Sequence, residues 1–391
     1  MKLFKMKDIW NQLKNISSKF RDLSLYSVGT LVTNGIGGIF WLYMASLLGT
    51  EGYGEISYLI SIAIMAGTIS LAGMSNLLIV YGAKNIKIQS TIFLIGLISS
   101  GITASIVFFV INNDITISLY IIGYVIFTLV TAELIGQKLF SKYSKIIIIQ
   151  KIMLVVFSIV LYHIIGLQGI MLGIAISFLL FIILMFKTFR KIKINFPILK
   201  SRYKFSINSF LLDISNAFNG SLDKIIIAPI LGFSLLGNYQ LGLQFIGLLY
   251  LIPGMLFSYA LSHDASGNST KLVKKMIIGI SILFSVLSII LSPILLPILF
   301  PQFTEAIVVI QIMSVSIVPS AIASTYISKY LGSENSKIVI IGSALYLSAQ
   351  IISIIILGNI YGLNGVALSV VISSIVHVMY FISIDKLYYK N

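Results

Sequence analysis

The sequence of 391 residues contains no cysteine, which excludes disulfide bonds and thiolate metal sites. Its three histidines, at 163, 263 and 377, lie far apart and form no pair with the spacing of metal ligands. Charge is also scarce, because 10% of the residues are charged, against about 25% in a typical soluble domain. These absences argue against a soluble metalloenzyme.

Apolar residues are abundant instead and make up 58% of the chain. This composition predicts an all-α polytopic membrane protein with little room for a soluble domain. A formal net charge of +15 would suggest nucleic-acid binding in a soluble protein. In a membrane protein the same excess is explained by topology, so no nucleic-acid partner is expected.

The first 22 residues lack the long uninterrupted apolar core of a secretory signal peptide. Apolar residues recur there at helical spacing between lysines: Met6, Ile9, Leu13, Ile16 and Phe20. This pattern predicts a cytoplasmic amphipathic segment on the membrane surface, with a frayed cytoplasmic tail as the alternative.

Twelve apolar stretches follow, each near the roughly 20 residues needed to cross a bilayer. They lie at about 26–48, 56–81, 90–111, 116–137, 146–165, 168–187, 205–231, 238–261, 275–298, 305–328, 337–357 and 362–383. With both termini in the cytoplasm, every lysine and arginine except Lys224 falls in or next to an inside segment. The positive-inside rule therefore supports twelve spans in the cytoplasmic membrane.

The basic linker 189–204 divides the spans into two sets of six. Glycine motifs repeat at equivalent places in the two sets. Gly49 and Gly54 after the first span match Gly232 and Gly237 after the seventh. We therefore expect two six-helix bundles, 23–188 and 205–391, related by a parallel pseudo-two-fold repeat.

A second motif supports the same repeat. Gly166-Leu-Gln-Gly169 opens the sixth span, and Gly362-Leu-Asn-Gly365 opens the twelfth. Transporters with this symmetry bind the substrate between their halves.

The seventh span carries polar residues at spacings of 3, 4, 3, 4 and 3, which is one face of a helix. They are Ser206, Ser209, Asp213, Asn216, Gly220 and Asp223. Charged groups within a membrane usually face a protein interior or a wet cavity. We expect Asp213 to bind a proton, Na⁺ or sugar hydroxyls, the alternative being an interhelical contact that only holds the helices together.

For Asp223 the same alternatives stand. Lys224 follows Asp223 directly and should point about 100° away from it, so it is not expected to be a facing partner. It either contacts a phosphate or extends outward to the interface. In the fourth span, Glu133 and Gln137 beside Lys138 form either a gate or, more simply, a boundary ion network.

The glycine motifs, together with the sequence Asp223-Lys-Ile-Ile-Ile-Ala-Pro-Ile-Leu-Gly232 and Asn238-Tyr239, resemble the polysaccharide biosynthesis membrane proteins. These are the O-antigen-type flippases of the multidrug/oligosaccharidyl-lipid/polysaccharide exporter superfamily, with a MATE-like fold. The resemblance implies two helix bundles that alternate between inward-open and outward-open states. It also implies a polyprenyl-(pyro)phosphate-linked oligosaccharide as substrate, and glycan polymerase or ligase machinery as partners.

This sequence departs from the cationic central cavity that is usual in the family, because only Lys224 lies clearly inside the membrane. Lys138, Lys151 and Lys204, close to the inner boundary, are expected to form a basic vestibule that contacts phosphate. Ser209, Asp213, Asn216, Asp223 and Lys224 are the expected cavity residues.

Three functions remain in comparison. The first is a flippase with no cofactor, coupled to H⁺ or Na⁺ through Asp213. The second is a multidrug or organic-cation antiporter of the same superfamily, which two intramembrane aspartates would suit. A membrane enzyme is disfavoured, because no outside loop is long enough for an active site and no paired acids form a metal motif.

Overall fold

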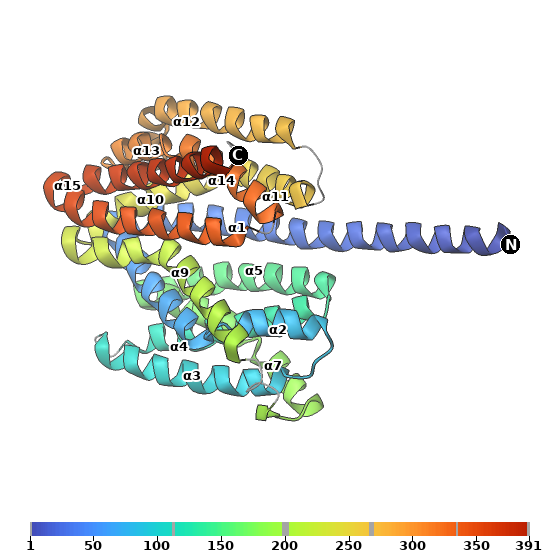
Figure 1. The fold of residues 1–391 in the computed structure, drawn as a ribbon. Coiled ribbons are helices and arrows are strands. Elements are labelled where there is room, and N and C mark those ends of the chain that lie inside the picture. Colours follow the sequence, from blue (N-terminus) through green and yellow to red (C-terminus); the bar gives the residue numbers. More distant parts are fainter. Residues whose placement is uncertain (1, 112–113, 198–202, 266–269, 334, 389–391) are drawn as a thin grey trace. The chain divides into compact units, whose positions relative to one another are not determined.

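The computed structural model describes the backbone of all residues except 1, 112–113, 198–202, 266–269, 334 and 389–391. Side chains are described except, in addition, those of 2–28, 203–205, 208, 211–212, 215–216, 219, 258, 262, 265 and 388. All secondary structure in these described parts is helical, as the composition predicts (Figure 1).

The chain forms two compact units. Unit 1 comprises Met1–Phe40 and Ile62–Ala217, and unit 2 comprises Trp41–Ser61 and Phe218–Asn391. The helices α1 and α9 each contribute residues to both units. These units do not test the predicted boundary between two repeated halves at the basic linker 189–204, which stays a prediction.

The helices of the first half begin with α1, which starts at Lys2 and includes the predicted amphipathic segment. They are α1 (Lys2–Leu71), α2 (Met74–Ala83), α3 (Gln89–Val110), α4 (Ile115–Gly136), α5 (Phe140–Ile165), α6 (Leu167–Leu179) and α7 (Ile182–Lys191). Where a polar capping residue precedes a helix, it determines where that helix starts. Asp114 caps α4 by accepting a hydrogen bond from the Thr116 backbone N–H at 2.7 Å.

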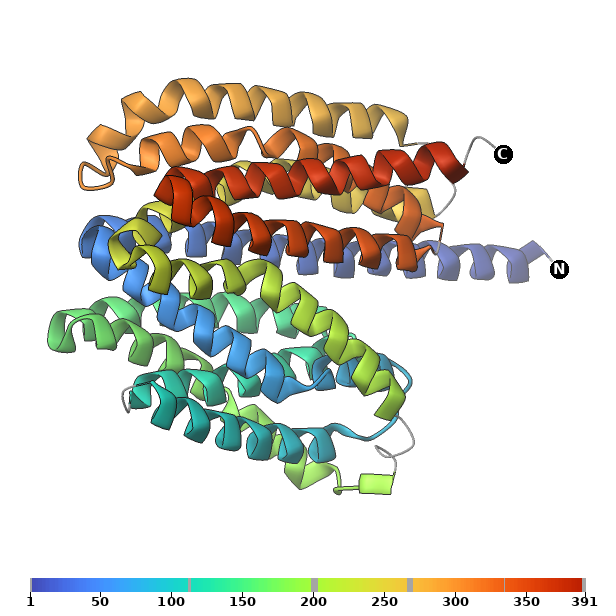
Figure 2. The same cartoon turned by 60° about the vertical axis from the view of Figure 1, so that its left-hand side comes forward.

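The second half begins with α9, and its last helix, α15, doubles back on itself (Figure 2). These helices are α9 (Tyr203–Leu231), α10 (Phe233–Leu249), α11 (Leu251–Ala265), α12 (Lys271–Leu299), α13 (Ala306–Ser314), α14 (Ile317–Gly332) and α15 (Ser336–Tyr388).

Seven described helices are long and apolar enough to cross a membrane, or nine when each of two bent pairs is one span. Two of the seven, Gly29–Leu71 and Ser336–Leu387, contain 43 and 52 residues. Each is about twice the length that one crossing needs. Each is also interrupted by a glycine with non-helical backbone angles, Gly49 and Gly362. The multi-pass membrane architecture is therefore confirmed, while the count of twelve and the orientation of the termini stay predictions.

The two glycine motifs of the sixth and twelfth predicted spans form the same turn. Gly166 and Gly362 have φ of +70° and +57°, which glycine adopts without the steric cost of a Cβ. Three residues later, a Cβ on Gly169 or Gly365 would collide with the carbonyl oxygen eight residues earlier in the chain. Both turns therefore let two antiparallel helices pack backbone to backbone.

The other motif pair is also alike in structure. Gly49 and Gly232 have φ of +67° and +82°. A Cβ on Gly54 would collide with the carbonyl oxygen of the residue after Gly232. A Cβ on Gly237 would likewise collide with the carbonyl oxygen of the residue after Gly49. This reciprocal contact lies within unit 2 and supports the predicted repeat, which as a relation of two six-helix bundles stays a prediction.

Each unit has its own apolar core. In unit 1 residues such as Leu77, Phe93 and Leu129 bring together α2, α3 and α4. In unit 2, Tyr239 and Val309 belong to a core shared by α9, α10, α13 and α15. Many large apolar side chains remain exposed, which is normal where hydrocarbon is the solvent.

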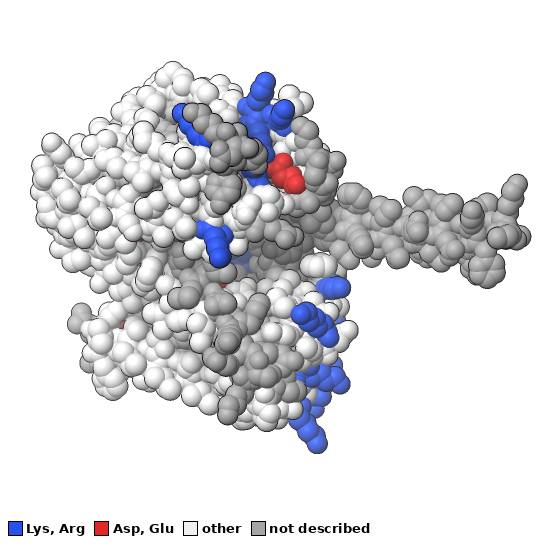
Figure 3. Space-filling view, in the orientation of Figure 1, with Lys and Arg blue, Asp and Glu red and all other residues white. Residues whose placement is uncertain are grey.

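The described lysines and arginines lie mainly near helix ends, and most of the surface of the described residues in Figure 3 is uncharged. This distribution is typical of a multi-pass protein whose apolar helices face lipid and whose basic residues lie near helix ends.

Candidate functional site

A break between α1 and α2 organises the candidate site in unit 1. Ala72 and Gly73, between the two helices, have φ of +46° and +75°. The α9 side chain Ser206 donates a hydrogen bond to the Ala72 carbonyl at 2.8 Å, which satisfies a backbone group that the break leaves free. Gly73 lies so close to α9 that a Cβ would collide with the Ser206 carbonyl.

Ser209 also packs at this break. It is buried, and a Cβ on Gly73 would lie 3.0 Å from its own Cβ. Ser209 therefore supports the close approach of α9 to the segment between α1 and α2. Its role as a cavity residue stays a prediction.

Asp213, one turn further along α9, contacts the first turn of α2. Its Oδ1 accepts a hydrogen bond from Asn76 Nδ2 at 3.0 Å, and its Oδ2 lies 3.5 Å from Ser75 Oγ. The carboxylate is only partly buried. Among the described side chains no lysine, arginine or histidine forms an ion pair with it. Two neutral donors leave part of its acceptor capacity unused.

This carboxylate opens into a cavity of about 310 Å³ within unit 1. The cavity is lined by four helices, and hydroxyl groups accompany the carboxylate. The lining residues are Ile64, Thr68, Leu71, Ser75, Tyr124, Thr128, Asp213 and Ala217. A single carboxylate with hydroxyl and amide oxygens suits a proton or a hard monovalent cation, or sugar hydroxyls. No group of three or more His, Cys, Asp or Glu occurs among the residues searched, so these residues offer no rich site for a divalent metal.

Asp223 has a different environment, in unit 2. It is 6% exposed, and its Oδ2 accepts a hydrogen bond from the Tyr239 hydroxyl at 2.9 Å. Its Oδ1 accepts one from the Lys224 backbone N–H at 2.9 Å. Asp223 is therefore a satisfied buried group, as expected of a carboxylate that holds helices together.

The expectation that Lys224 and Asp223 point apart is wrong. Lys224 Nζ lies 3.4 Å from Asp223 Oδ1 and donates a hydrogen bond to the Gly220 carbonyl at 2.5 Å. The flexible four-carbon side chain bends back toward its own helix, so the direction of the Cβ does not decide where the ammonium lies. In this conformation Lys224 is buried and paired.

The predicted vestibule lysines differ in position. Lys138 is exposed, in the turn between α4 and α5. Lys151 lies in α5, eleven residues after its start at Phe140, or about 16 Å of helix. The side chains of Lys204 and of Asn216, another predicted cavity residue, lie outside the described residues.

Lys151 is partly buried and faces α1. A Cβ on Gly37 would lie 3.4 Å from its Nζ, in van der Waals contact, so the ammonium lies directly against this part of α1. Lys151 forms no ion pair with any described acidic side chain. It does not line the Asp213 cavity.

Glu133 forms the network that the sequence suggested, but with neutral partners. It accepts hydrogen bonds from Gln137 Nε2 at 2.9 Å and from the Thr188 hydroxyl at 3.1 Å. Lys138 is exposed and does not pair with it. This contact ties α4 to α7 at one end of unit 1.

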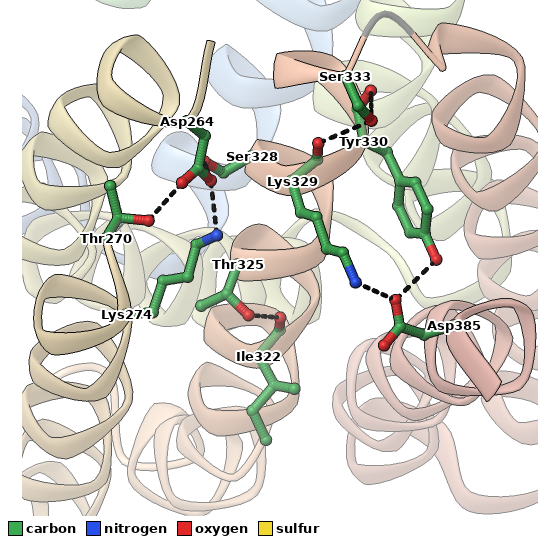
Figure 4. A network of polar contacts seen from close by, with 10 residues as sticks. All are labelled: Asp264, Thr270, Lys274, Ile322, Thr325, Ser328, Lys329, Tyr330, Ser333 and Asp385. Carbon is green, nitrogen blue, oxygen red and sulfur yellow. Dashed lines mark hydrogen bonds and ion pairs between the residues drawn. The ribbon is translucent and has the colours of Figure 1, made fainter. Parts of the chain in front are cut away.

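A further polar network joins the ends of four helices in unit 2 (Figure 4). Asp264, near the end of α11, accepts hydrogen bonds from Thr270 and from Ser328 of α14, and forms an ion pair with Lys274 of α12 at 2.6 Å. Burial acts to raise the pKa of Asp264. The hydrogen bonds from Lys274, Ser328 and Thr270 outweigh it and hold that pKa below its usual value.

Beside it, Asp385 of α15 pairs with Lys329 of α14 at 2.6 Å and accepts a hydrogen bond from the Tyr330 hydroxyl at 3.1 Å (Figure 4). The two clusters come from consecutive residues of α14, since Ser328 belongs to one and Lys329 to the other. Together they fix the ends of α11, α12, α14 and α15.

Sequence reasoning missed the hydroxyl-bearing cavity wall: Thr68, Ser75, Tyr124 and Thr128. Tyr124 and Thr128 lie four residues apart and so share one face of their helix, which is the one signal that could have selected them. Asn76 is the one side-chain amide in its predicted span, and only the fold shows that it bonds to Asp213.

Solved structures share this architecture. The Lipid II flippase MurJ in an inward closed conformation matches with a TM-score of 0.77 at 18% identity, covering 93% of this chain and 87% of that chain. The chain has the fold of the MurJ and MATE transporters. An inward-facing multidrug resistance MATE family transporter of the MOP superfamily matches with a TM-score of 0.67 at 13% identity, covering 93% and 94%.

The Vibrio cholerae MATE transporter VcmN in its bent form has the same fold, with a TM-score of 0.55 at 12% identity, covering 94% and 97%. No family model and no curated protein matches the sequence. The MATE-like fold that the sequence resemblance implied is thus confirmed. At these identities the likeness establishes the fold alone.

Proposed function

We propose that this protein is a flippase that moves a polyprenyl-(pyro)phosphate-linked oligosaccharide across the cytoplasmic membrane by alternating access, for surface polysaccharide or glycan assembly. The lipid tail stays in the bilayer while the phosphate and sugar pass through the protein. Glycan polymerase or ligase machinery would then use the translocated product.

Lys151 carries this proposal. Its ammonium is partly buried deep along α5, opposite Gly37, and has no carboxylate partner among the described side chains. A lone ammonium in an apolar protein needs a counter-charge, and a lipid-linked phosphate supplies one together with strong hydrogen-bond acceptors. Lys138, exposed in the turn that precedes the same helix, provides a second basic group.

Asp213 is the candidate coupling group. Its carboxylate is partly buried and lies beside Asn76, Ser75 and the hydroxyl-lined cavity, so it can take up H⁺ or Na⁺. Binding a cation there would neutralise the carboxylate and so favour whichever conformation holds it better. A gradient of that cation would then drive the cycle.

The alternative is a multidrug or organic-cation antiporter. The Asp213 cavity favours it, because a carboxylate with a tyrosine at the wall can bind an organic cation. Lys151 disfavours it, because a partly buried positive charge repels such a substrate.

The decisive test reconstitutes the protein in liposomes with a fluorescent polyprenyl-pyrophosphate oligosaccharide, with and without H⁺ or Na⁺ gradients. We expect Lys151→Ala to raise the lipid concentration needed for half-maximal flipping about tenfold, since one charge-assisted contact is lost. Lys142→Ala, which removes an exposed lysine of the same helix, is the matched control and should behave as wild type.

Asp213→Asn should still bind the lipid but flip it without response to the gradient. Normal flipping by Lys151→Ala would remove the basis of the phosphate assignment. Gradient-driven efflux of an organic cation that needs Asp213, with no lipid translocation, would move the protein to the antiporters.

A further inference from the structure

A second cavity, also of about 310 Å³, lies in unit 2 where three helix ends meet. It forms between the start of α10, the start of α13 and the Gly362 bend of α15. Its lining residues are Leu235, Glu305, Val308, Tyr361, Leu363 and Asn364. Leu363 is buried and anchors the floor of the cavity to the core of unit 2.

Three polar side chains at this cavity are free to bind a ligand. Glu305 and Asn364 are exposed, and the ring of Tyr361 is 62% exposed. Within the described part of the chain, none of the three side chains takes part in a hydrogen bond or ion pair. The neighbouring Asn359 is also exposed, but its amide donates to the Ile355 carbonyl at 2.7 Å.

The charges of the cavity select the ligand class. Glu305 repels phosphate, and none of the lining residues is a lysine or arginine that could attract it. One exposed carboxylate with one amide is a poor cage for a metal cation, which needs several oxygen ligands. A purely apolar ligand would leave three polar groups without partners.

A saccharide satisfies all three groups. The carboxylate of Glu305 and the amide of Asn364 offer acceptors and a donor for hydroxyl groups. The exposed face of Tyr361 can pack against the C–H face of a sugar ring, while its hydroxyl keeps a polar contact. Apolar walls with a few placed polar groups are the usual composition of a small-molecule site.

We propose that this cavity binds the saccharide portion of the transported lipid. The proposal rests on the proposed flippase function for the identity of that saccharide. Sequence topology places Glu305 and Tyr361–Asn364 on the outer side, so the cavity is a subsite for the sugar as it leaves the protein. The sugar would bind at this cavity, while the phosphate would bind to basic residues elsewhere in the protein.

The test uses the oligosaccharides that mild acid releases from the polyprenyl-linked lipids of the source membrane. Saturation-transfer NMR measures their binding to the full chain in nanodiscs. We expect transfer to sugar ring protons with the wild type. Binding should weaken about tenfold in Glu305→Ala, which removes a charge-assisted hydrogen bond, and in Tyr361→Ala. Inorganic pyrophosphate at the same concentration should not displace the sugar.

Asn359→Ala is the matched control, since it removes an exposed amide of the same segment that already bonds to its own helix. It should bind sugar as the wild type does. All three substitutions are at exposed positions, and thermal unfolding of each variant verifies that the fold is retained. Absence of saturation transfer in the wild type, or unchanged transfer in both Glu305→Ala and Tyr361→Ala, overturns the proposal and leaves Tyr361 as an interfacial anchor.

The outcome is separable from that of the proposed function. Flipping in liposomes without sugar binding at this cavity refutes the subsite and leaves the flippase. Sugar binding lost in these variants, in a protein that moves no lipid-linked substrate, supports the subsite and refutes the flippase.

Discussion

Asp213 and Asp223 lie on the same helix and on the same polar stripe, yet they differ in burial and in hydrogen-bond partners. Asp213 is partly buried beside a cavity, with one good hydrogen bond and one long one. Asp223 is 6% exposed and has a tyrosine hydroxyl, a backbone N–H and a lysine around it. Of the two, Asp213 retains acceptor capacity toward open space.

The difference teaches that an intramembrane charge is not by itself a site. What counts is the hydrogen-bond acceptor capacity that a carboxylate retains after it has bonded to the protein's own donors. Asp223 uses that capacity on Tyr239 and Lys224 and so stabilises the fold. Asp213 keeps part of it, which is what a transported or coupling ion requires.

The largest expected effect is on stability. Asp223→Ala leaves the Lys224 ammonium buried without its carboxylate and should cost about 3–5 kcal/mol of unfolding free energy. Asp213→Ala, with no ion-pair partner among the described residues, should cost less than about 1 kcal/mol. Thermal unfolding in detergent compares the two. Equal losses would end the distinction between the two carboxylates.

The double variant Asp223→Asn with Lys224→Met sharpens this result. It removes both charges at once, so no unpaired ion remains, and it should recover most of the stability that Asp223→Ala loses. If the double variant is as unstable as the single one, the shape of this contact matters more than its charge.

Tyr239→Phe should have the next largest effect, about 1–3 kcal/mol, because it leaves one oxygen of the buried Asp223 without its donor. Tyr361→Phe is a matched control, since that hydroxyl has no partner among the described groups and its ring is exposed. Equilibrium unfolding measures both. A loss for Tyr361→Phe as large as that for Tyr239→Phe would contradict the assignment of Asp223 as the satisfied carboxylate.

Asp264 extends the comparison to a carboxylate at a helix end. Its folded pKa lies below its unfolded value, so the charged form stabilises the fold. That contribution is fully present above about pH 4, near the pKa of an unfolded aspartate, and is lost as pH falls through the lower folded pKa. Asp264→Asn should therefore be less stable than wild type by about 1 kcal/mol at pH 7 and equal to it in strong acid. A difference in stability between Asp264→Asn and wild type that increases in acid would show that the charged form of Asp264 does not stabilise the fold.

The smallest effect is expected at Ser75. Its hydroxyl lies 3.5 Å from Asp213, too far for a strong bond, so Ser75→Ala should change stability by less than about 0.5 kcal/mol. The same variant should shift the cation concentration that half-saturates gradient-driven transport, because one hydroxyl ligand is lost from the cavity. Unchanged cation dependence would show that ions do not bind on the Ser75 side of Asp213.

The sequence predicted the helical fold and part of the site because both depend on short-range patterns. The face formed by Ser206, Ser209 and Asp213 does point one way, toward the break at Ala72 and Gly73. The pattern could not show that Ser206 and Ser209 serve the break, since that requires knowing which helix lies opposite. It also could not show that Lys224 bends back to Asp223, because a long side chain has many rotamers.

The sequence by itself determined that the chain is an apolar, helical membrane protein. It also placed glycine at turns with positive φ, such as Gly166 and Gly362, and at close backbone contacts, such as Gly54 and Gly237. Those properties follow from composition and from the steric freedom of single residues. Only the tertiary structure decided which polar groups are satisfied. It set Tyr239 against Asp223, left Asp213 beside a cavity and gathered Glu305, Tyr361 and Asn364 at one rim, because hydrogen bonding between distant residues depends on how the helices pack.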